Sequence, residues 1–325
     1  MPGVIPDEQL ARDQLRHLEI VPEGIARMES LLAEEPLSLP RWDDAPILPG
    51  VTPEVAEYML LINSCNFSYW PDPGQPEWGV ELEGRWWPDA LGLFGCFARA
   101  LRRDPRWLEG GFLAGLSRES FDEAFAGTGP LPMADARYRI LREVGEALSA
   151  RWQGRFHNLI EEAGGDAVRL VELLIGTVPP FYDVRELGGE IYAFHKRPQL
   201  AVAMICGRFE RRGLGDLRRF EELTVFADYM LPRGLRGAGV LRYGEELARI
   251  VDAEQEIPQG HPMEVEIRQA TLVSTQRIVT SLVQGSETRA PRPEITASHL
   301  DQYLWRAGFS WPGLRPFHRT RTTGY

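Results

Sequence analysis

Residues 22–34 read PEGIARMESLLAE, and this stretch shows the pattern that decides the fold. Its apolar side chains fall at positions i, i+3, i+6 and i+7, namely Ile25, Met28, Leu31 and Leu32. Residues at these spacings share one face of an α-helix, and a proline suits the first helical turn. The stretch therefore predicts an amphipathic α-helix that begins at Pro22.

The same periodicity recurs along the chain, and Pro and Gly clusters separate the stretches that show it. Further helices are predicted over residues 52–63, 88–102, 134–150, 166–175, 190–209, 217–230, 244–253, 262–282 and 295–307. Neither a repeat period nor a flexible linker divides the sequence. We therefore predict an all-α fold in which residues 1–325 form a single compact multi-helix domain.

One segment predicts β structure instead. Residues 66–70 and 79–87 alternate aromatic and polar side chains on either side of a turn-rich loop at 71–76. We expect a small aromatic β-hairpin, inserted in the helical domain at about residues 64–88. It has two interpretations, a flap that packs on the helical body or a cover whose tip closes over a pocket.

The charge of the chain limits its partners. The 325 residues carry 36 basic and 47 acidic side chains, for a net charge of −11. An acidic surface repels a phosphate backbone, so we expect no direct binding to nucleic acid. Since no apolar stretch is long enough to span a bilayer and residues 1–12 lack the apolar core of a signal sequence, a cytoplasmic protein without a membrane partner is predicted, most simply a monomer.

Common metal and cofactor motifs are absent from the sequence. The 3 cysteines and 6 histidines are scattered, so neither a disulfide framework nor a metal centre is expected. The chain also lacks a glycine-rich phosphate loop, a dinucleotide-binding glycine motif and the usual zinc-protease and serine-hydrolase motifs. We therefore predict no cofactor.

Lys196 is the one lysine among 36 basic residues. In a chain so biased toward arginine, a remaining lysine indicates either a place that needs a compact ammonium or a surface position with no special role. It stands beside Arg197 in the string FHKRPQL (194–200), directly before an apolar run. Either one or two of these cations line a pocket, or the string is a solvated helix start.

Asp228 lies in the apolar string LTVFADYMLP (223–232). Because the predicted helix runs into Pro232, this acid is expected in its last turn, where a carboxylate opposes the helix dipole. It is therefore either functional or a surface group paired with Arg233. Phe226 and Tyr229 flank it with aromatic surface on which a planar ligand can stack.

Asp301 and Trp305, in the string DQYLW (301–305), are four residues apart and share a helix face. An acid beside an indole can recognise the donor edge of a guanine-like base, and it can equally be a surface pair.

Strings in order along the chain resemble the queuosine salvage family. They are NSCNFSYW (63–70), FYD (181–183), FHKRPQL (194–200), LTVFADYMLP (223–232), EVEIR (264–268), DQYLW (301–305) and PFHRTR (316–321). No single string is diagnostic, but together they run in register from about residue 10 to the end of the chain.

This resemblance implies an enzyme and its substrate. The family is similar to N-glycosidases that act on queuosine 5′-monophosphate, a small-molecule nucleotide, and release queuine and ribose 5-phosphate. The implied fold is all-helical and akin to that of helix-hairpin-helix DNA glycosylases. The family's catalytic aspartate falls on Asp228 and its Lys-Arg pair on Lys196 and Arg197, while the base-contacting phenylalanine and the acid near the C-terminus fall on Phe226 and Asp301.

Two positions depart from the family pattern. Gln14 stands where the family has a histidine in its first helix, and Arg306 stands where it has an acid after the Tyr-Leu-Trp run. Both departures concern the contacts to the base. Gln14 is kept among the predicted substrate-binding residues, and so is Trp305 of the string DQYLW.

Queuine is a 7-deazaguanine, which has carbon where a purine glycosidase would protonate N7. The departing base must therefore be helped in another way, and the predicted route is an oxocarbenium-like ribosyl transition state stabilised by Asp228. Asp228 either adds to C1′ or holds the attacking water, and Lys196 either anchors the 5′-phosphate or ribose oxygens or forms a Schiff base.

Two rival functions remain at this point. A helical scaffold with a partner groove would show a repeat of about 35–45 residues, and none is found. A DNA-base glycosylase is suggested only by analogy of fold, and the net charge of −11 opposes duplex binding.

Overall fold

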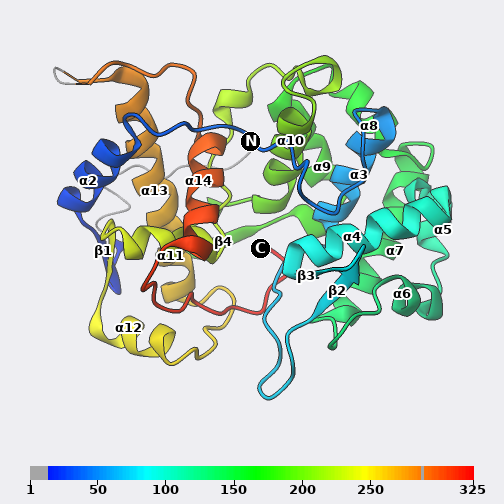
Figure 1. Cartoon of the computed structure of the whole chain (residues 1–325), viewed down its shortest axis with the longest axis horizontal. Coiled ribbons are helices and arrows are strands. Elements are labelled where there is room, and N and C mark those ends of the chain that lie inside the picture. Colours follow the sequence, from blue (N-terminus) through cyan, green and yellow to red (C-terminus); the bar gives the residue numbers. More distant parts are fainter. Residues whose placement is uncertain (1–13, 287–288) are drawn as a thin grey trace.

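A computed structural model describes residues 14–286 and 289–325, and it is mostly helical (Figure 1). The α-helices are α2 (Pro22–Leu32), α3 (Pro53–Ser64), α4 (Asp89–Arg103), α5 (Gly110–Ala114), α6 (Arg118–Ala124), α7 (Ala134–Arg151), α8 (Phe156–Glu162), α9 (Ala167–Thr177), α10 (Lys196–Arg208), α11 (Met230–Gly237), α12 (Glu245–Asp252), α13 (Pro262–Gln284) and α14 (Ala297–Ser310). Short strands are β1 (Leu18–Ile20), β2 (Gly79–Leu82), β3 (Arg85–Pro88), β4 (Val184–Leu187), β5 (Glu190–Ala193) and β6 (Leu241–Tyr243). The prediction of a helical fold is confirmed.

Eight of the predicted helices begin and end within three residues of an observed helix, and the exceptions are residues 190–209 and 217–230. These eight stretches have apolar residues at helical spacing together with a Pro or Gly near an end, which fixes both the type of element and its limits. The longest of them, α13, is buried along most of its length.

Two hydrophobic clusters form the core. One is built from residues 47–226, around α3, α4, α7, α9 and α10, and the other from residues 18–32 and 192–304, around α2, α11, α13 and α14. Figure 1 shows the corresponding helices as two groups, with α2, α13 and α14 in one and α3 to α9 in the other. A site between the groups can therefore draw side chains from both.

The prediction of a helix over residues 217–230 is wrong. Residues Phe220–Glu222 form one 3₁₀ turn, residues 223–228 have no regular secondary structure, and α11 begins only at Met230. The helical spacing of the apolar residues is present, but the main chain of this segment bonds to side chains of other elements, as described below. Tertiary contacts have overridden a local pattern here.

The predicted hairpin exists with a different pairing. Strand β2 pairs with β3 in antiparallel register, and residues 66–70 are not a strand. The turn lies at Glu83 and Gly84, which have φ values of 53° and 76°, and a tight hairpin needs positive φ at both turn positions.

The β structure is also more extensive than predicted. Strands β4 and β5 form a second hairpin, and β5 occupies the first residues of the predicted helix 190–209, so α10 begins only at Lys196. The turn between β4 and β5 is Gly188–Gly189, with φ values of 61° and 85°. Strand β1 pairs with β6, which joins the start of the described chain to the segment after α11.

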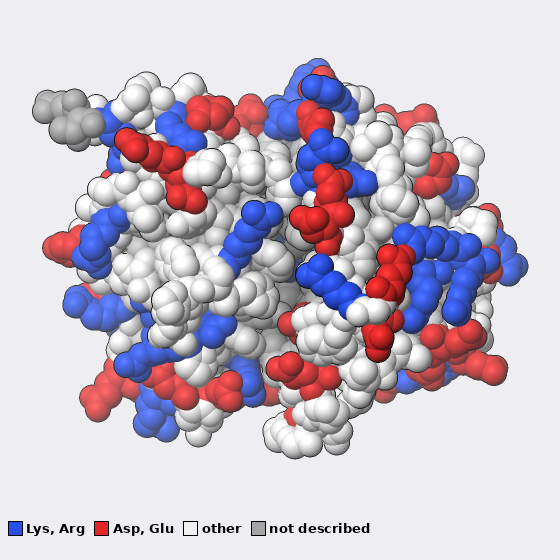
Figure 2. All heavy atoms as spheres, viewed as in Figure 1, with Lys and Arg blue, Asp and Glu red and all other residues white. Residues whose placement is uncertain are grey.

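None of the helices in the described ranges combines the length and hydrophobicity that crossing a bilayer requires. On the face shown in Figure 2, acidic and basic side chains are mostly interspersed, with one group of adjoining basic side chains at the right of the view.

Candidate active site

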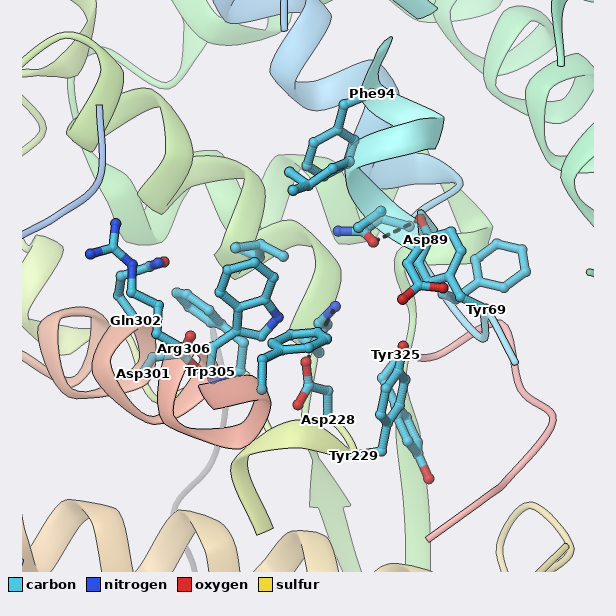
Figure 3. A pocket seen from close by; sticks show the side chains of 18 of the residues that line it. Tyr69, Asp89, Phe94, Asp228, Tyr229, Asp301, Gln302, Trp305, Arg306 and Tyr325 are labelled. Atoms are coloured by element: carbon cyan, nitrogen blue, oxygen red, sulfur yellow. Dashed lines mark hydrogen bonds and ion pairs between the residues drawn. The ribbon is translucent and has the colours of Figure 1, made fainter. Parts of the chain in front are cut away.

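A cavity of about 520 Å³ lies where α14 faces the starts of α4 and α10 (Figure 3). This volume is within the range of small-molecule sites, about 300–1,000 Å³. Its wall is largely apolar and aromatic, and its charged residues are Asp89, Lys196, Asp228, Asp301 and Arg306. An apolar pocket with a few converging polar groups is typical of a ligand-binding site.

The cavity brings together six of the eight residues that the sequence singles out. They are Lys196, Phe226, Asp228, Tyr229, Asp301 and Trp305. They come from three separate parts of the chain, which are the first residue of α10, the segment before α11, and one face of α14.

Asp228 precedes α11, so its predicted position in the last turn of a helix is wrong. Pro232 is the third residue of α11, where proline is tolerated because the first-turn amides have no partner inside the helix. Asp228 Oδ1 accepts hydrogen bonds from the amides of Met230 (2.8 Å) and Leu231 (3.2 Å). The carboxylate therefore caps α11 at the end where the helix dipole favours a negative charge.

The irregular segment 223–228, which carries Asp228, is fixed by three distant side chains. Gln199 Oε1 accepts from the Thr224 amide (2.9 Å), Asp301 Oδ2 accepts from the Phe226 amide (2.7 Å), and Arg268 Nε donates to the Ala227 carbonyl (3.0 Å). These bonds give the buried main-chain N–H and C=O groups the hydrogen-bond partners that a helix would otherwise supply. These bonds hold the chain just before Asp228, and its bonds to the α11 amides hold the chain just after it.

A buried charge network lies behind this segment. Arg268 Nη2 is 2.5 Å from Asp183 Oδ2 and Nη1 is 3.5 Å from Glu264 Oε1. Its guanidinium carbon also lies 3.9 Å from the ring centre of Phe194 and 4.1 Å from that of Tyr325. The strings FYD and EVEIR therefore meet at Arg268, a role that the sequence analysis did not assign to them.

Close packing places α14 next to Asp228. A Cβ atom at Gly308 would come within 2.9 Å of the Met230 carbonyl oxygen, so only glycine permits this approach of α14 to the start of α11. The approach sets Asp301 and Trp305 of α14 along one side of the cavity.

Lys196 Nζ lies 3.9 Å from Asp228 Oδ2. Both side chains are buried, with 7% and 9% of their surface exposed. Lys196 is the first residue of α10, where the helix dipole disfavours a cation, so α10 itself gives no reason for a lysine there. Its partner is Asp228, which faces it from the start of α11.

The three buried charges at the centre of the cavity perturb one another. Burial lowers the pKa of Lys196, although Asp228 and Asp301 both oppose the change. Burial also raises the pKa of Asp228 against the effects of Lys196 and of the two α11 amides. The pKa of Asp301 is raised well above its usual range by burial and by the charge of Asp228.

The two central acids differ in the groups that stabilise their negative charge. Asp228 has a cation and two amide donors to stabilise its negative charge, whereas Asp301 has the single amide of Phe226. The site therefore stabilises a negative charge on Asp228 better than one on Asp301. The arrangement presents one carboxylate to the cavity beside a lysine, which can stabilise positive charge that develops on a ligand.

Aromatic rings complete the wall. The ring of Trp305 meets that of Trp42 edge to face at 6.2 Å between centroids. Tyr229 packs on Trp70 at 5.3 Å and on Phe317 at 4.7 Å. Phe226 also lines the cavity and is buried.

Arg197 and Gln14 lie elsewhere. The Arg197 guanidinium donates to the carbonyls of Ser64 and Pro180. Gln14 Oε1 accepts from the Tyr192 hydroxyl and from Gln269 Nε2, the latter at 3.2 Å. Neither residue lines the cavity, and their part in substrate binding stays a prediction.

The sequence analysis missed several lining residues. Asp89 begins α4, and Tyr325 is the last residue of the chain, with its hydroxyl 3.0 Å from Glu264 Oε1. Neither belongs to a recognisable local motif, although Asn66 and Tyr69, which also line the cavity, belong to the string NSCNFSYW. Within residues 14–286 and 289–325, no group of three or more His, Cys, Asp and Glu side chains is arranged to hold a metal ion.

Comparison with known proteins identifies the family. Residues 49–325 match the family model described as "Queuosine salvage protein". A protein of Sphaerobacter thermophilus named "Queuosine 5'-phosphate N-glycosylase/hydrolase" is 33% identical over 324 residues, which cover 99% of this chain and 98% of the relative. Proteins with the same name from Mus musculus and Dictyostelium discoideum are 29% and 31% identical, covering 93% and 83% of this chain and 93% and 78% of their own. The chain therefore belongs to the queuosine salvage protein family.

Proposed function

We propose that this protein hydrolyses the N-glycosidic bond of queuosine 5′-monophosphate and releases queuine and ribose 5-phosphate. The observation that carries the proposal is the pair formed by Asp228 and Lys196 in a cavity large enough for a nucleotide. The names of the relatives support the same substrate. Chromatography of the products after incubation with queuosine 5′-monophosphate tests it, and release of no queuine would contradict it.

In the proposed mechanism the ribosyl group gains positive charge as the C1′–N9 bond breaks. The bonding electron pair leaves with the base, and a water oxygen forms the new bond to C1′. One O–H bond of that water breaks, and the released base gains one proton overall. The ionised Asp228 stabilises the oxocarbenium-like transition state, either by adding to C1′ before water does or by holding the water. Its two bonds to α11 fix the carboxylate before substrate arrives, so little reorganisation is needed.

The base is proposed to lie against α14. Asp301 Oδ1 has no hydrogen-bond partner among the described residues and belongs to a residue that lines the cavity. A guanine-like edge carries a ring N–H and an exocyclic amine, for which a carboxyl oxygen is a suitable acceptor. Phe226 would stack on the ring while Asp301 fixes its in-plane orientation.

Asp301→Asn is expected to weaken queuine binding by about 2 kcal/mol and to raise KM, with a smaller effect on kcat. Asparagine still offers an oxygen to the Phe226 amide, so the segment before α11 keeps its anchor. The NH2 group of the asparagine side chain would instead face the N–H donors of the base, and two donors cannot form a hydrogen bond with each other. Calorimetric titration with queuine measures the effect, and affinity equal to wild type would assign Asp301 to positioning of Phe226 alone.

The phosphate is proposed to be bound by the cations of the cavity. Lys196 is already opposite Asp228, whereas Arg306 is exposed and its side chain has no hydrogen bond or ion pair within the described ranges. Other arginines near the C-terminus are paired with acids, as in Arg315 with Asp252 and Arg319 with Glu254. Arg306 is therefore the better candidate for a phosphate contact.

We expect the 5′-monophosphate to be preferred to the free nucleoside by about 10- to 150-fold in kcat/KM, the effect of one charge-assisted contact. Arg306→Ala should reduce this ratio by lowering kcat/KM for the nucleotide. Arg315→Ala, a matched change outside the cavity, should leave the ratio as in wild type. If Arg306→Ala leaves this preference unchanged, the phosphate contact belongs to Lys196. In that case Lys196→Ala should reduce the preference for the 5′-monophosphate.

We further propose the finer features expected from the sequence. Residues 1–325 would act as one domain and as a cytoplasmic monomer, without a cofactor and without binding nucleic acid, on a fold akin to that of helix-hairpin-helix DNA glycosylases. The net charge of −11 supports the exclusion of nucleic acid. The cavity between the two core clusters supports a single functional unit.

A further inference from the structure

Asp89 is an unusual residue of the cavity wall. It begins α4 with φ of 50°, in the left-handed region that Asp and Asn tolerate better than most residues. Its carboxylate lines the cavity, and no described residue forms a hydrogen bond or ion pair with it. Burial, with a smaller contribution from the charge of Glu77, raises the pKa of Asp89 to about 7. A carboxylate in this position lacks a cation.

The other two acids of the cavity differ in this respect. Asp228 faces Lys196 and accepts two amides, and Asp301 accepts the amide of Phe226. Among the described residues that line the cavity, Asp89 is therefore the carboxylate without a partner. Burying a polar group without a partner costs free energy, which a bound ligand of opposite charge can recover.

Asp89 also lies at a different end of the cavity. In Figure 3 it stands with Tyr69 and Tyr325, on the side opposite Asp301 and Trp305, and Asp228 lies between the two sides. The base edge is assigned to Asp301, and the reacting ribose carbon to Asp228. The end at Asp89 thus remains for a part of the ligand that neither acid contacts.

The hydroxyls beside Asp89 are already engaged. The Tyr69 hydroxyl donates to Asn66 Oδ1 at 2.9 Å, and the Tyr325 hydroxyl donates to Glu264 Oε1 at 3.0 Å. These two side chains therefore offer mainly aromatic surface, and Asp89 supplies the charge at this end of the cavity.

Queuosine carries a group of matching chemistry. Its base bears at C7 a methylene, a secondary amine and a cyclopentene diol, and a secondary alkylamine is protonated at neutral pH. C7 belongs to the five-membered ring, so this arm extends away from the N–H and amine edge of the six-membered ring. A base with that edge at Asp301 would direct its cationic arm toward the opposite side of the cavity.

We propose that Asp89 binds the protonated amine of this arm and so selects queuosine nucleotides over nucleotides whose base lacks the cation, an inference that rests on the proposed function. Asp89 is then a specificity-determining residue rather than part of the bond-breaking machinery. Tyr69 and Tyr325 would cover the apolar face of the cyclopentene ring.

The test compares two substrates in Asp89→Asn. Asparagine keeps the size of the side chain and tolerates the left-handed backbone, so the variant removes the charge with little other change. For queuosine 5′-monophosphate, kcat/KM is expected to fall by about 10- to 100-fold. For 7-deazaguanosine 5′-monophosphate, which lacks the arm, it should change by less than about threefold.

Each outcome has a distinct meaning. Equal losses on both substrates, or no loss on either, would overturn the assignment of Asp89 to the amine. Asp89→Glu restores the charge and should recover part of the selectivity, whereas Asp44→Asn, at an exposed position outside the cavity, should behave as wild type. Should wild type hydrolyse neither nucleotide, the proposed function itself would fail, and this result is distinguishable from the others.

A second measurement does not depend on any variant. Wild type should bind queuine at least about tenfold more tightly than 7-deazaguanine, and the difference should shrink as rising pH deprotonates the amine. Equal affinities at neutral pH would overturn the proposal even if the Asp89 variants failed to fold.

Discussion

Asp228→Asn is expected to lower the rate of N-glycosidic hydrolysis by about 100- to 1000-fold, while the protein still folds and still binds queuine. Asparagine caps helices about as well as aspartate, so its oxygen can still accept from the Met230 and Leu231 amides. What the change removes is the negative charge opposite Lys196, at the place where the ribosyl group becomes positive. The loss should therefore fall on kcat rather than on binding of the base.

Single-turnover hydrolysis of queuosine 5′-monophosphate measures this loss, and calorimetry with queuine measures the binding that should remain. Asp166→Asn is a matched control, because Asp166 also caps a helix, accepting from the Arg169 amide at 2.8 Å, but lies outside the cavity. It should hydrolyse at the wild-type rate. An Asp228→Asn rate within about threefold of wild type would remove this residue from the mechanism.

The pH dependence of kcat/KM provides an independent check on the same residue. Burial raises the pKa of Asp228, so the rising limb should lie above the usual carboxyl range, because only the ionised form is active. The part of the rising limb that Asp228 causes should be absent from Asp228→Asn, whereas ionisation of Asp89, which is proposed to bind the substrate amine, should still contribute to the limb. Burial lowers the pKa of Lys196, so a falling limb is expected below the usual lysine range as the ammonium is lost.

The sequence predicted most of the helices because their local pattern and their final environment agree. In α13, for example, apolar spacing and the proline at its start both indicate a helix, and the core needs one there. Residues 217–230 have similar spacing, yet residues 223–228 form no helix because Gln199, Asp301 and Arg268 bond to their main chain. Such partners are distant in sequence and leave no local signal.

The candidate site was predicted in part for the same reason. Lys196 stands out in the sequence as the one lysine of the chain, and it lines the cavity. The prediction for Asp228 depended partly on Pro232 as the sign of a helix end. Pro232 in fact lies in the first turn of α11, since proline suits a first turn as well as the residue after a helix. Asp89 follows no motif, and it reaches the cavity because α4 begins opposite α14, which only the assembled fold determines.

Asp183→Asn is expected to lower the free energy of unfolding by about 3 kcal/mol at neutral pH, near the lower end of the cost of breaking a buried ion pair. Arg268 is fully buried, and the variant would leave its guanidinium with Glu264 at 3.5 Å as the nearest acid. Burial alone would raise the pKa of Asp183, but the charge and hydrogen bonds of Arg268 outweigh burial and hold it below its usual value. The ion pair therefore contributes to the free energy of unfolding above about pH 4, the pKa of an aspartate in the unfolded state. This contribution is lost as the pH falls through the pKa of Asp183 in the folded state.

Urea unfolding as a function of pH measures this contribution, and Asp122→Asn, which breaks an exposed pair with Arg118, should cost less than about 1 kcal/mol. The double variant Asp183→Asn/Arg268→Met should regain part of the stability, because an uncharged, well-packed replacement for a buried ion pair is often neutral or stabilising. Its activity should be lower than that of Asp183→Asn, because the Ala227 carbonyl, next to Asp228, would lack the hydrogen bond from Arg268. Full activity in a stable double variant would mean that the network serves folding alone and that Asp228 is positioned by α11 and Lys196 without it.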